Sequence, residues 1–131
     1  MTKNVTPFLM FEGDAEAAMN LYVSAFSDAT IQHLERFGPD ESGAEGSVKM
    51  GVLTIGEQRF RCFDSSQPHA FSFTPPFSIF VECESEDELN QLYETLSDGG
   101  EVLMPLDNYG FSTRFSWVND RFGVSWQLNL A

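Results

Sequence analysis

Two strand-like segments near the end of the chain carry polar side chains at every second position. Between Gly123 and Leu130, polar residues alternate with the apolar Val124, Trp126 and Leu128, and the polar set is Ser125, Gln127 and Asn129. Between Phe111 and Val118, the residues Ser112, Arg114 and Ser116 alternate with Thr113, Phe115 and Trp117. We expect the apolar set of the last segment to pack under helices, and the sets that contain Gln127 and Arg114 to face one ligand-binding space.

Arg114 is the sharpest candidate in this group, because the chain has seven basic residues against twenty acidic ones. A guanidinium inside a cavity can hold a carboxylate or phosphate group through paired hydrogen bonds. The alternative is an ion pair between Arg114 and one of the twenty acids.

Four aromatic residues could line the same space as apolar walls. The candidates are Phe63, Phe80, Tyr109 and Phe111. Ordinary core packing is the alternative, because the chain contains 13 phenylalanines.

The thiols and imidazoles give weaker signals. Cys62 and Cys83 each lie in an apolar run, where a reduced thiol behaves as a small hydrophobe, and two cysteines do not indicate a disulfide framework. As a nucleophile, Cys62 would need a positive field, and only Arg59 and Arg61 are adjacent in sequence. His33 in a polar strand and His69 in a loop are interpreted as surface or loop residues.

The first half of the chain predicts one strand, one helix and three strands. An apolar run ended by Glu12-Gly13 precedes a helix capped by Asp14, and Gly56-Glu57 joins the last two strands as a tight hairpin. The predicted elements are a strand at 5–11, a helix at 15–26, and strands at 29–37, 47–55 and 58–64. A loop rich in glycine and acids occupies 38–47.

The second half predicts the same order. Ser85 and Glu88 match a capping box at the start of a helix, and Asp98-Gly99-Gly100 predicts a left-handed stop at its end. The predicted elements are a strand at 77–83, a helix from the capping box to about 97, and strands at 101–106, 111–118 and 123–130. The apolar stripe of this helix is predicted to be Leu89, Leu92, Tyr93 and Leu96. A shift of 71 residues superposes it on the predicted stripe of the first helix, Ala18, Leu21, Tyr22 and Ala25.

This repetition predicts an α+β fold made of two βαβββ modules, with mixed, curved sheets that form a cup and helices on the outside. We expect one domain over residues 1–131. Module one covers about 5–65, a linker about 65–76, and module two about 77–130.

Composition limits the partners of this domain. A formal net charge of −13 repels phosphate backbones and anionic lipid surfaces, so we expect no nucleic acid and no membrane as partner. No apolar run approaches the roughly 20 residues of a membrane span, and the first residues lack the pattern of a signal peptide, so we expect a cytoplasmic protein.

Four segments carry a resemblance to a known family: FLMFEGDAEAAMNLYVSAF, FSFTPPFSIFVEC, DGGEVLMPL and VNDRFGVSWQL. The chain resembles the PhnB-like proteins, often labelled 3-demethylubiquinone-9 3-methyltransferase, of the vicinal oxygen chelate superfamily that includes glyoxalase, bleomycin resistance proteins and dioxygenases. The resemblance implies paired βαβββ modules, a cup-shaped cavity for a small molecule, and a homodimer. A methyltransferase of the usual kind holds its cofactor with a glycine-rich strand-to-helix turn, and this sequence has no such turn, so the methyltransferase label is not supported.

The resemblance also implies where a glyoxalase-type metal centre would take its ligands. The first three positions fall at about Pro7, at Cys62 or Phe63, and at Phe77 or Ser78, and the fourth falls on Gln127. Only Gln127 is a plausible ligand, whereas a catalytic divalent site normally needs three N, O or S side chains. We therefore expect no metal and no other cofactor, and a divalent metal is the disfavoured alternative.

Three functions fit the sequence. The first is a binding protein that holds a small organic molecule in an aromatic cup, with Arg114, Gln127, Ser116, Ser125, Phe63, Phe80 and Tyr109 as the candidate ligand-binding residues. The second is an enzyme of the lyase, isomerase or dioxygenase type, either metal-dependent or using Arg114 and Gln127 to polarise a substrate carbonyl. The third is a purely structural or regulatory role, which predicts no ordered cavity.

Overall fold

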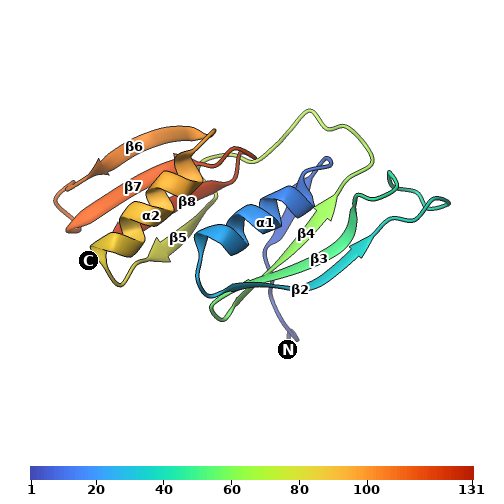
Figure 1. Ribbon diagram of the computed structural model, residues 1–131, viewed down its shortest axis with the longest axis horizontal. Coiled ribbons are helices and arrows are strands. Elements are labelled where there is room, and N and C mark those ends of the chain that lie inside the picture. Colours follow the sequence, from blue (N-terminus) through green and yellow to red (C-terminus); the bar gives the residue numbers. More distant parts are fainter. The chain divides into compact units, whose positions relative to one another are not determined.

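The computed structural model describes residues 1–131, and the chain divides into two compact units at 1–69 and 70–131. Each unit has the predicted order of one strand, one helix and three strands (Figure 1). The fold class of two βαβββ modules is therefore confirmed. The boundary between the units falls inside the predicted linker.

The first unit contains β1 (Phe8–Phe11), α1 (Ala15–Ala25), β2 (Ala29–Arg36), β3 (Val48–Ile55) and β4 (Gln58–Asp64). Its four strands form a sheet in the order β1-β4-β3-β2, in which β1 pairs in parallel with β4 and the other pairs are antiparallel. Gly56, with φ of 58°, provides the left-handed residue of the tight β3 to β4 turn, as predicted.

The second unit contains β5 (Ser78–Glu82), α2 (Glu86–Ser97), β6 (Glu101–Asp107), β7 (Arg114–Asn119) and β8 (Ser125–Leu130). The strand order β5-β8-β7-β6 repeats that of the first sheet, again with a parallel first pair. Gly99, with φ of 75°, follows the end of α2 and confirms the predicted left-handed stop.

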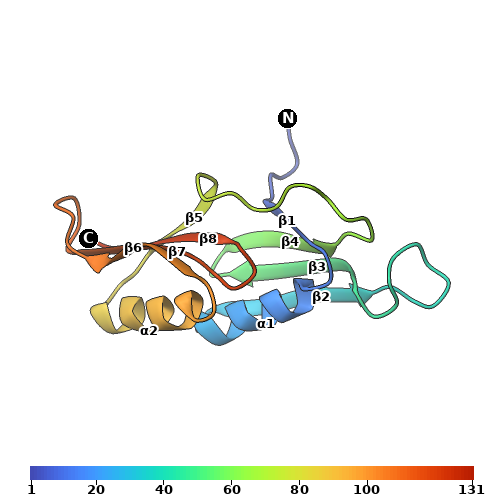
Figure 2. The ribbon, with the colours of Figure 1, turned by 90° about the horizontal axis from the view of Figure 1, so that it is seen from above.

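In each unit, taken by itself, the helix lies along one face of its sheet (Figure 2). Of the predicted stripe of α2, Leu89, Leu92 and Leu96 are buried and Tyr93 is half-buried. The stripe of α1 differs from the prediction at one turn, because Met19 is fully buried while Leu21 is only half-buried. The Met19 side chain reaches Gly51 of β3, where a Cβ added to the glycine would lie 2.8 Å from the Met19 Sδ, so the glycine makes room for the helix.

The two helices begin differently. The hydroxyl of Ser85 accepts a hydrogen bond from the Glu88 backbone N–H at 3.1 Å, and the Glu88 carboxylate accepts one from Glu84 N–H, so the predicted capping box forms with its return bond one residue earlier. The prediction that Asp14 caps α1 is wrong as regards its side chain, which makes no capping hydrogen bond. Asp64, at the end of β4, accepts from Ala15 N–H in its place.

Neither helix is long and apolar enough to cross a membrane.

Candidate functional site

Strand register decides which residues of the second unit share a face. On β7 and β8, Val118 lies opposite Trp126 and Ser116 lies opposite Leu128, and all four are at most 1% exposed. This is the face covered by α2. The opposite face is called uncovered because α2 does not pack on it. It carries Gln127 and the residues that share its face, namely Phe115, Trp117, Ser125 and Asn129.

The predictions that Val124, Trp126 and Leu128 are buried and that Gln127 lies on the sheet face away from α2 are therefore confirmed. The Gln127 side chain is half-buried, and its Nε2 donates to the Ser78 hydroxyl at 2.7 Å. Ser125, which is buried, accepts from Trp117 Nε1 at 2.8 Å and donates to the Pro75 carbonyl at 3.0 Å. These bonds fix both side chains in the sheet surface.

The prediction that Arg114 and Ser116 share the face of Gln127 is wrong. The antiparallel register places Trp117 opposite Gln127, so Arg114 and Ser116 point to the side of α2. Arg114 Nη1 lies 3.3 Å from an oxygen of Glu86, the first residue of α2, which is the ion-pair alternative considered above. The Ser116 hydroxyl is buried and donates to the Met104 carbonyl at 2.9 Å.

Aromatic side chains form a cluster on the uncovered face of the second sheet. The rings of Phe80, Tyr109 and Phe111 surround Phe115, with centroid distances to Phe115 of 6.5, 6.1 and 5.0 Å. Phe115 is 3% exposed, whereas Phe80 is 53%, Tyr109 37% and Phe111 63% exposed. Phe80 lies beside Gln127 in the β5 to β8 register, so the cluster adjoins a polar amide.

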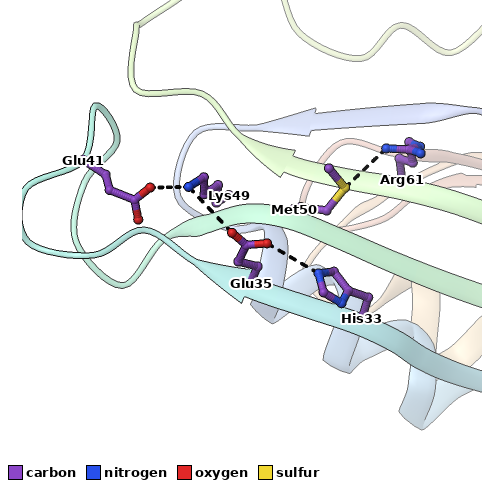
Figure 3. A network of polar contacts seen from close by, with 6 residues as sticks. All are labelled: His33, Glu35, Glu41, Lys49, Met50 and Arg61. Carbon is purple, nitrogen blue, oxygen red and sulfur yellow. Dashed lines mark hydrogen bonds and ion pairs between the residues drawn. The ribbon is translucent and has the colours of Figure 1, made fainter.

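The uncovered face of the first sheet has a different character. Phe63 of β4 is half-buried and contacts the rings of Phe8 at 5.9 Å and Phe37 at 6.4 Å. Arg59 and Arg61 alternate with buried residues of β4, so they share the face of Phe63 and are exposed. Figure 3 shows this face, with Arg61 donating to the sulfur of Met50 at 3.3 Å.

A hollow of about 530 Å³ lies in the first unit and was not predicted. Its lining comes from the end of β1, the loop after β2 and the segment after β4: Glu12, Gly13, Ser42, Gly43, Ala44, Ser47, Asp64, Ser65, Ser66, Gln67 and Pro68. Next to it the Ser65 hydroxyl lies 3.0 Å from Nε2 of His69, which is half-buried. The glycine- and serine-rich composition of the two loops is the only sequence signal for this hollow.

The thiols are poorly placed for nucleophilic chemistry. Cys62 is buried on the face of the first sheet that α1 covers, and burial, with the Asp64 carboxylate as a second cause, raises its pKa to about 12. Burial is also the main cause that raises the pKa of Cys83 to about 12, and the Glu88 carboxylate adds to it. Both groups are therefore neutral thiols at neutral pH.

The side chains at the four positions implied for a glyoxalase-type metal do not suit that group. Pro7 has no donor side chain, Cys62 points to the α1 side of the sheet while Phe63 is an aromatic ring, and Phe77 is exposed beside Ser78, whose hydroxyl is bonded to Gln127. No three histidine, cysteine, aspartate or glutamate side chains in residues 1–131 converge as metal ligands would. Gln127 alone is too few donors for a divalent site.

Comparison with known families adds to this geometry. A family model described as 3-demethylubiquinone-9 3-methyltransferase matches residues 3–129. The chain belongs to this family. A solved PhnB protein from Bacillus cereus, provisionally named as a 3-demethylubiquinone-9 3-methyltransferase, is 46% identical, with a TM-score of 0.95 over 98% of this chain and 100% of that one.

More distant structures show the fold of this 3-demethylubiquinone-9 3-methyltransferase family member. A protein from Pseudomonas aeruginosa is 26% identical, with a TM-score of 0.85 over 98% of each chain. The fosfomycin resistance protein FosX from Mesorhizobium loti is 13% identical, with a TM-score of 0.63 over 100% of this chain and 94% of that one. The fold is thus that of the glyoxalase and bleomycin resistance proteins. No curated protein matches the chain.

Proposed function

We propose that the protein is a member of the vicinal oxygen chelate superfamily that binds a small organic molecule on an uncovered sheet face, without a glyoxalase-type metal centre. The aromatic cluster on the second sheet carries this proposal. Three of its rings are more than one third exposed although they pack around a buried fourth. An exposed aromatic surface of this kind marks a binding site more often than a random part of a protein surface.

The polar groups beside the cluster suit recognition of an uncharged polar substituent. Gln127 keeps its amide oxygen for a ligand donor, because only its Nε2 is used by Ser78. Phe80 and Tyr109 provide stacking area, and the Tyr109 ring is held by a bond from its hydroxyl to the Pro105 carbonyl at 2.5 Å. A flat molecule with one hydrogen-bond donor fits this chemistry.

Binding rather than methyl transfer is proposed because the two strand-to-helix turns do not resemble a methyltransferase cofactor site. The turn after β1 is Glu12-Gly13-Asp14, and the turn after β5 is Cys83-Glu84-Ser85. Each puts carboxylates near the helix start, where a nucleotide-type cofactor needs a glycine-rich backbone. The proposal also omits the glyoxalase-type metal, because only Gln127 among the four implied ligand positions has a suitable side chain.

The resemblance to the PhnB-like proteins extends the proposal to a homodimer. Light scattering on the purified protein measures this directly, and a monomer at micromolar concentration contradicts it.

Thermal shift and titration calorimetry test the ligand proposal, with benzyl alcohol, benzamide, benzoate and phenylphosphonate as probes. A ligand that binds only the folded state raises the melting temperature. For a probe bound at the cluster, Phe80→Ala and Phe111→Ala are expected to weaken binding about fivefold or more, because each removes a stacked ring. Phe77→Ala removes an exposed ring outside the cluster and serves as the matched control.

The proposed function is wrong if none of the four probes binds the wild-type protein. A stoichiometric transition metal in the purified protein, found by elemental analysis and removed by substituting Gln127, would refute the metal-free part.

A further inference from the structure

The seven basic side chains of this acidic protein are used unequally. Four of them form ion pairs with carboxylates: Arg36 with Glu16, Lys49 with Glu35 and Glu41, Arg114 with Glu86, and Arg121 with Asp98. Lys3 lies in the segment before β1. The two that remain, Arg59 and Arg61, lie on one strand and have no carboxylate within 4.0 Å.

Arg61 is surrounded mainly by apolar side chains. Phe8 of β1 and Val52 of β3 are its register neighbours on either side, and Phe63 follows it on the same face of β4. The Arg61 guanidinium has five N–H donors, and its contact with Met50 uses only one of them, on a thioether sulfur that is a weak acceptor. Phe8 is 56% and Met50 38% exposed, so the guanidinium lies in an open apolar surface.

Carboxylates near this surface are already engaged with other groups. Figure 3 shows Glu35 directed at Lys49 and His33, at 3.6 Å from each, while Glu41 also contacts Lys49. Arg61 on the same face contacts only the Met50 sulfur among the residues drawn. The local arrangement therefore neutralises Lys49 and leaves Arg61 available.

We propose that the uncovered face of the first sheet binds a small organic oxyanion with a flat apolar body, held by Arg61 through paired hydrogen bonds. This inference rests on the proposed function, that the chain binds small organic molecules on uncovered sheet faces, and adds a second site, for an anion, on the first unit. The planar fork of Arg61 matches a carboxylate or a phosphonate group, and Phe8, Phe63 and Met50 contact the apolar part. Arg59, two residues away and roughly 7 Å along the strand, adds a second positive charge.

The net charge of −13 makes this surface selective. The chain as a whole repels anions, so an anion binds only where local donors outweigh that field. Arg61 provides such a place, because its N–H groups have no carboxylate partner and a charged donor forms stronger hydrogen bonds than a neutral one.

Titration calorimetry on the full chain with benzoate, phenylphosphonate and benzamide tests this inference. The three probes share a phenyl ring and differ in charge. At least one of the two anions is expected to bind and to depend on Arg61. Benzamide has no charge for Arg61 to hold, and its binding at the aromatic cluster of the second unit should not depend on Arg61. Tighter benzoate binding identifies a carboxylate ligand, and tighter phenylphosphonate binding identifies a phosphonate or phosphate monoester.

Arg61→Gln is expected to weaken binding of the anion by about tenfold or more and to leave the affinity for benzamide unchanged. Arg61→Lys should retain part of the anion affinity, because it keeps the charge and loses the fork. Arg36→Gln removes the same charge from β2 of the first sheet, where the guanidinium is paired with Glu16 of α1, and should leave anion binding within about twofold.

Three results overturn the inference while the proposed function stands: benzamide binding without binding of either anion, unchanged anion affinity in Arg61→Gln, or an equal loss in Arg36→Gln. Dissociation of an oligomer by Arg61→Gln, without loss of anion affinity in the monomer, would also overturn it, because Arg61 would then pair with a protein carboxylate. If no probe binds, neutral or anionic, the proposed function fails together with the inference.

Discussion

Asp64 is the residue whose substitution tests the fold of the first unit most directly. Its carboxylate is 2% exposed and accepts three backbone hydrogen bonds. Oδ1 accepts from Gly13 N–H and Ala15 N–H, both at 2.9 Å, and Oδ2 accepts from Val48 N–H at 2.8 Å. One side chain therefore holds the turn after β1, the start of α1 and the start of β3.

Asp64→Asn is nearly isosteric and changes mainly the third of these bonds. The asparagine oxygen can still accept from Gly13 and Ala15, but its NH₂ group then faces the Val48 N–H, and two donors cannot bond. The loss combines a charge-assisted hydrogen bond of about 1.5–3 kcal/mol with a buried backbone donor left unsatisfied at about 1–3 kcal/mol. We expect the free energy of unfolding to fall by about 3–5 kcal/mol.

Urea unfolding followed by tryptophan fluorescence measures this change, and amide hydrogen exchange locates it at Val48. Asp14→Asn is the matched control, because it removes the same charge at the adjacent helix terminus from a side chain that makes no capping bond. That variant should change stability by less than about 0.5 kcal/mol. A loss below about 1 kcal/mol for Asp64→Asn, or an equal loss for both variants, would refute the assignment of the cap to Asp64.

Two further predictions concern packing and ionisation. Gly100→Ala should lower the free energy of unfolding in urea by about 3 kcal/mol or more, because the added Cβ would lie 2.1 Å from the backbone oxygen of Asn119. Gly38→Ala is the control, because its added Cβ would lie 3.4 Å from the flexible Glu41 carboxylate, and its stability should be within about 1 kcal/mol of wild type. Similar losses in both variants would contradict the clash at Gly100. Folding raises the pKa values of Cys62 and Cys83 from 9.0 to about 12. As the pH rises above 9, the thiols of the unfolded chain lose their protons before those of the folded chain. Their contribution to stability is therefore complete below pH 9 and declines toward pH 12. The free energy of unfolding should fall by up to about 3 kcal/mol between pH 8 and 10, and a Cys62→Ala, Cys83→Ala double variant with an equally steep decline would show that other groups cause it.

The sequence by itself determined the architecture, because each module's signals are local. Turn glycines, helix periodicity and strand alternation act within a few residues, and their repetition after about 71 positions predicts two βαβββ units without any long-range information. The boundaries shifted only by a few residues, as at β7, which begins at Arg114 and not at Phe111.

Only the tertiary structure decided which groups meet. Alternation separates Arg114 from Phe115 but cannot say which of the two faces α2, because a register change of one residue exchanges the faces. Likewise Asp14 has the right type and place to cap α1, yet Asp64, 49 residues beyond the Ala15 N–H that it accepts, takes that role through the parallel pairing of β1 with β4. The availability of Arg61 has the same origin, since an ion pair depends on which acids the sheet brings within reach.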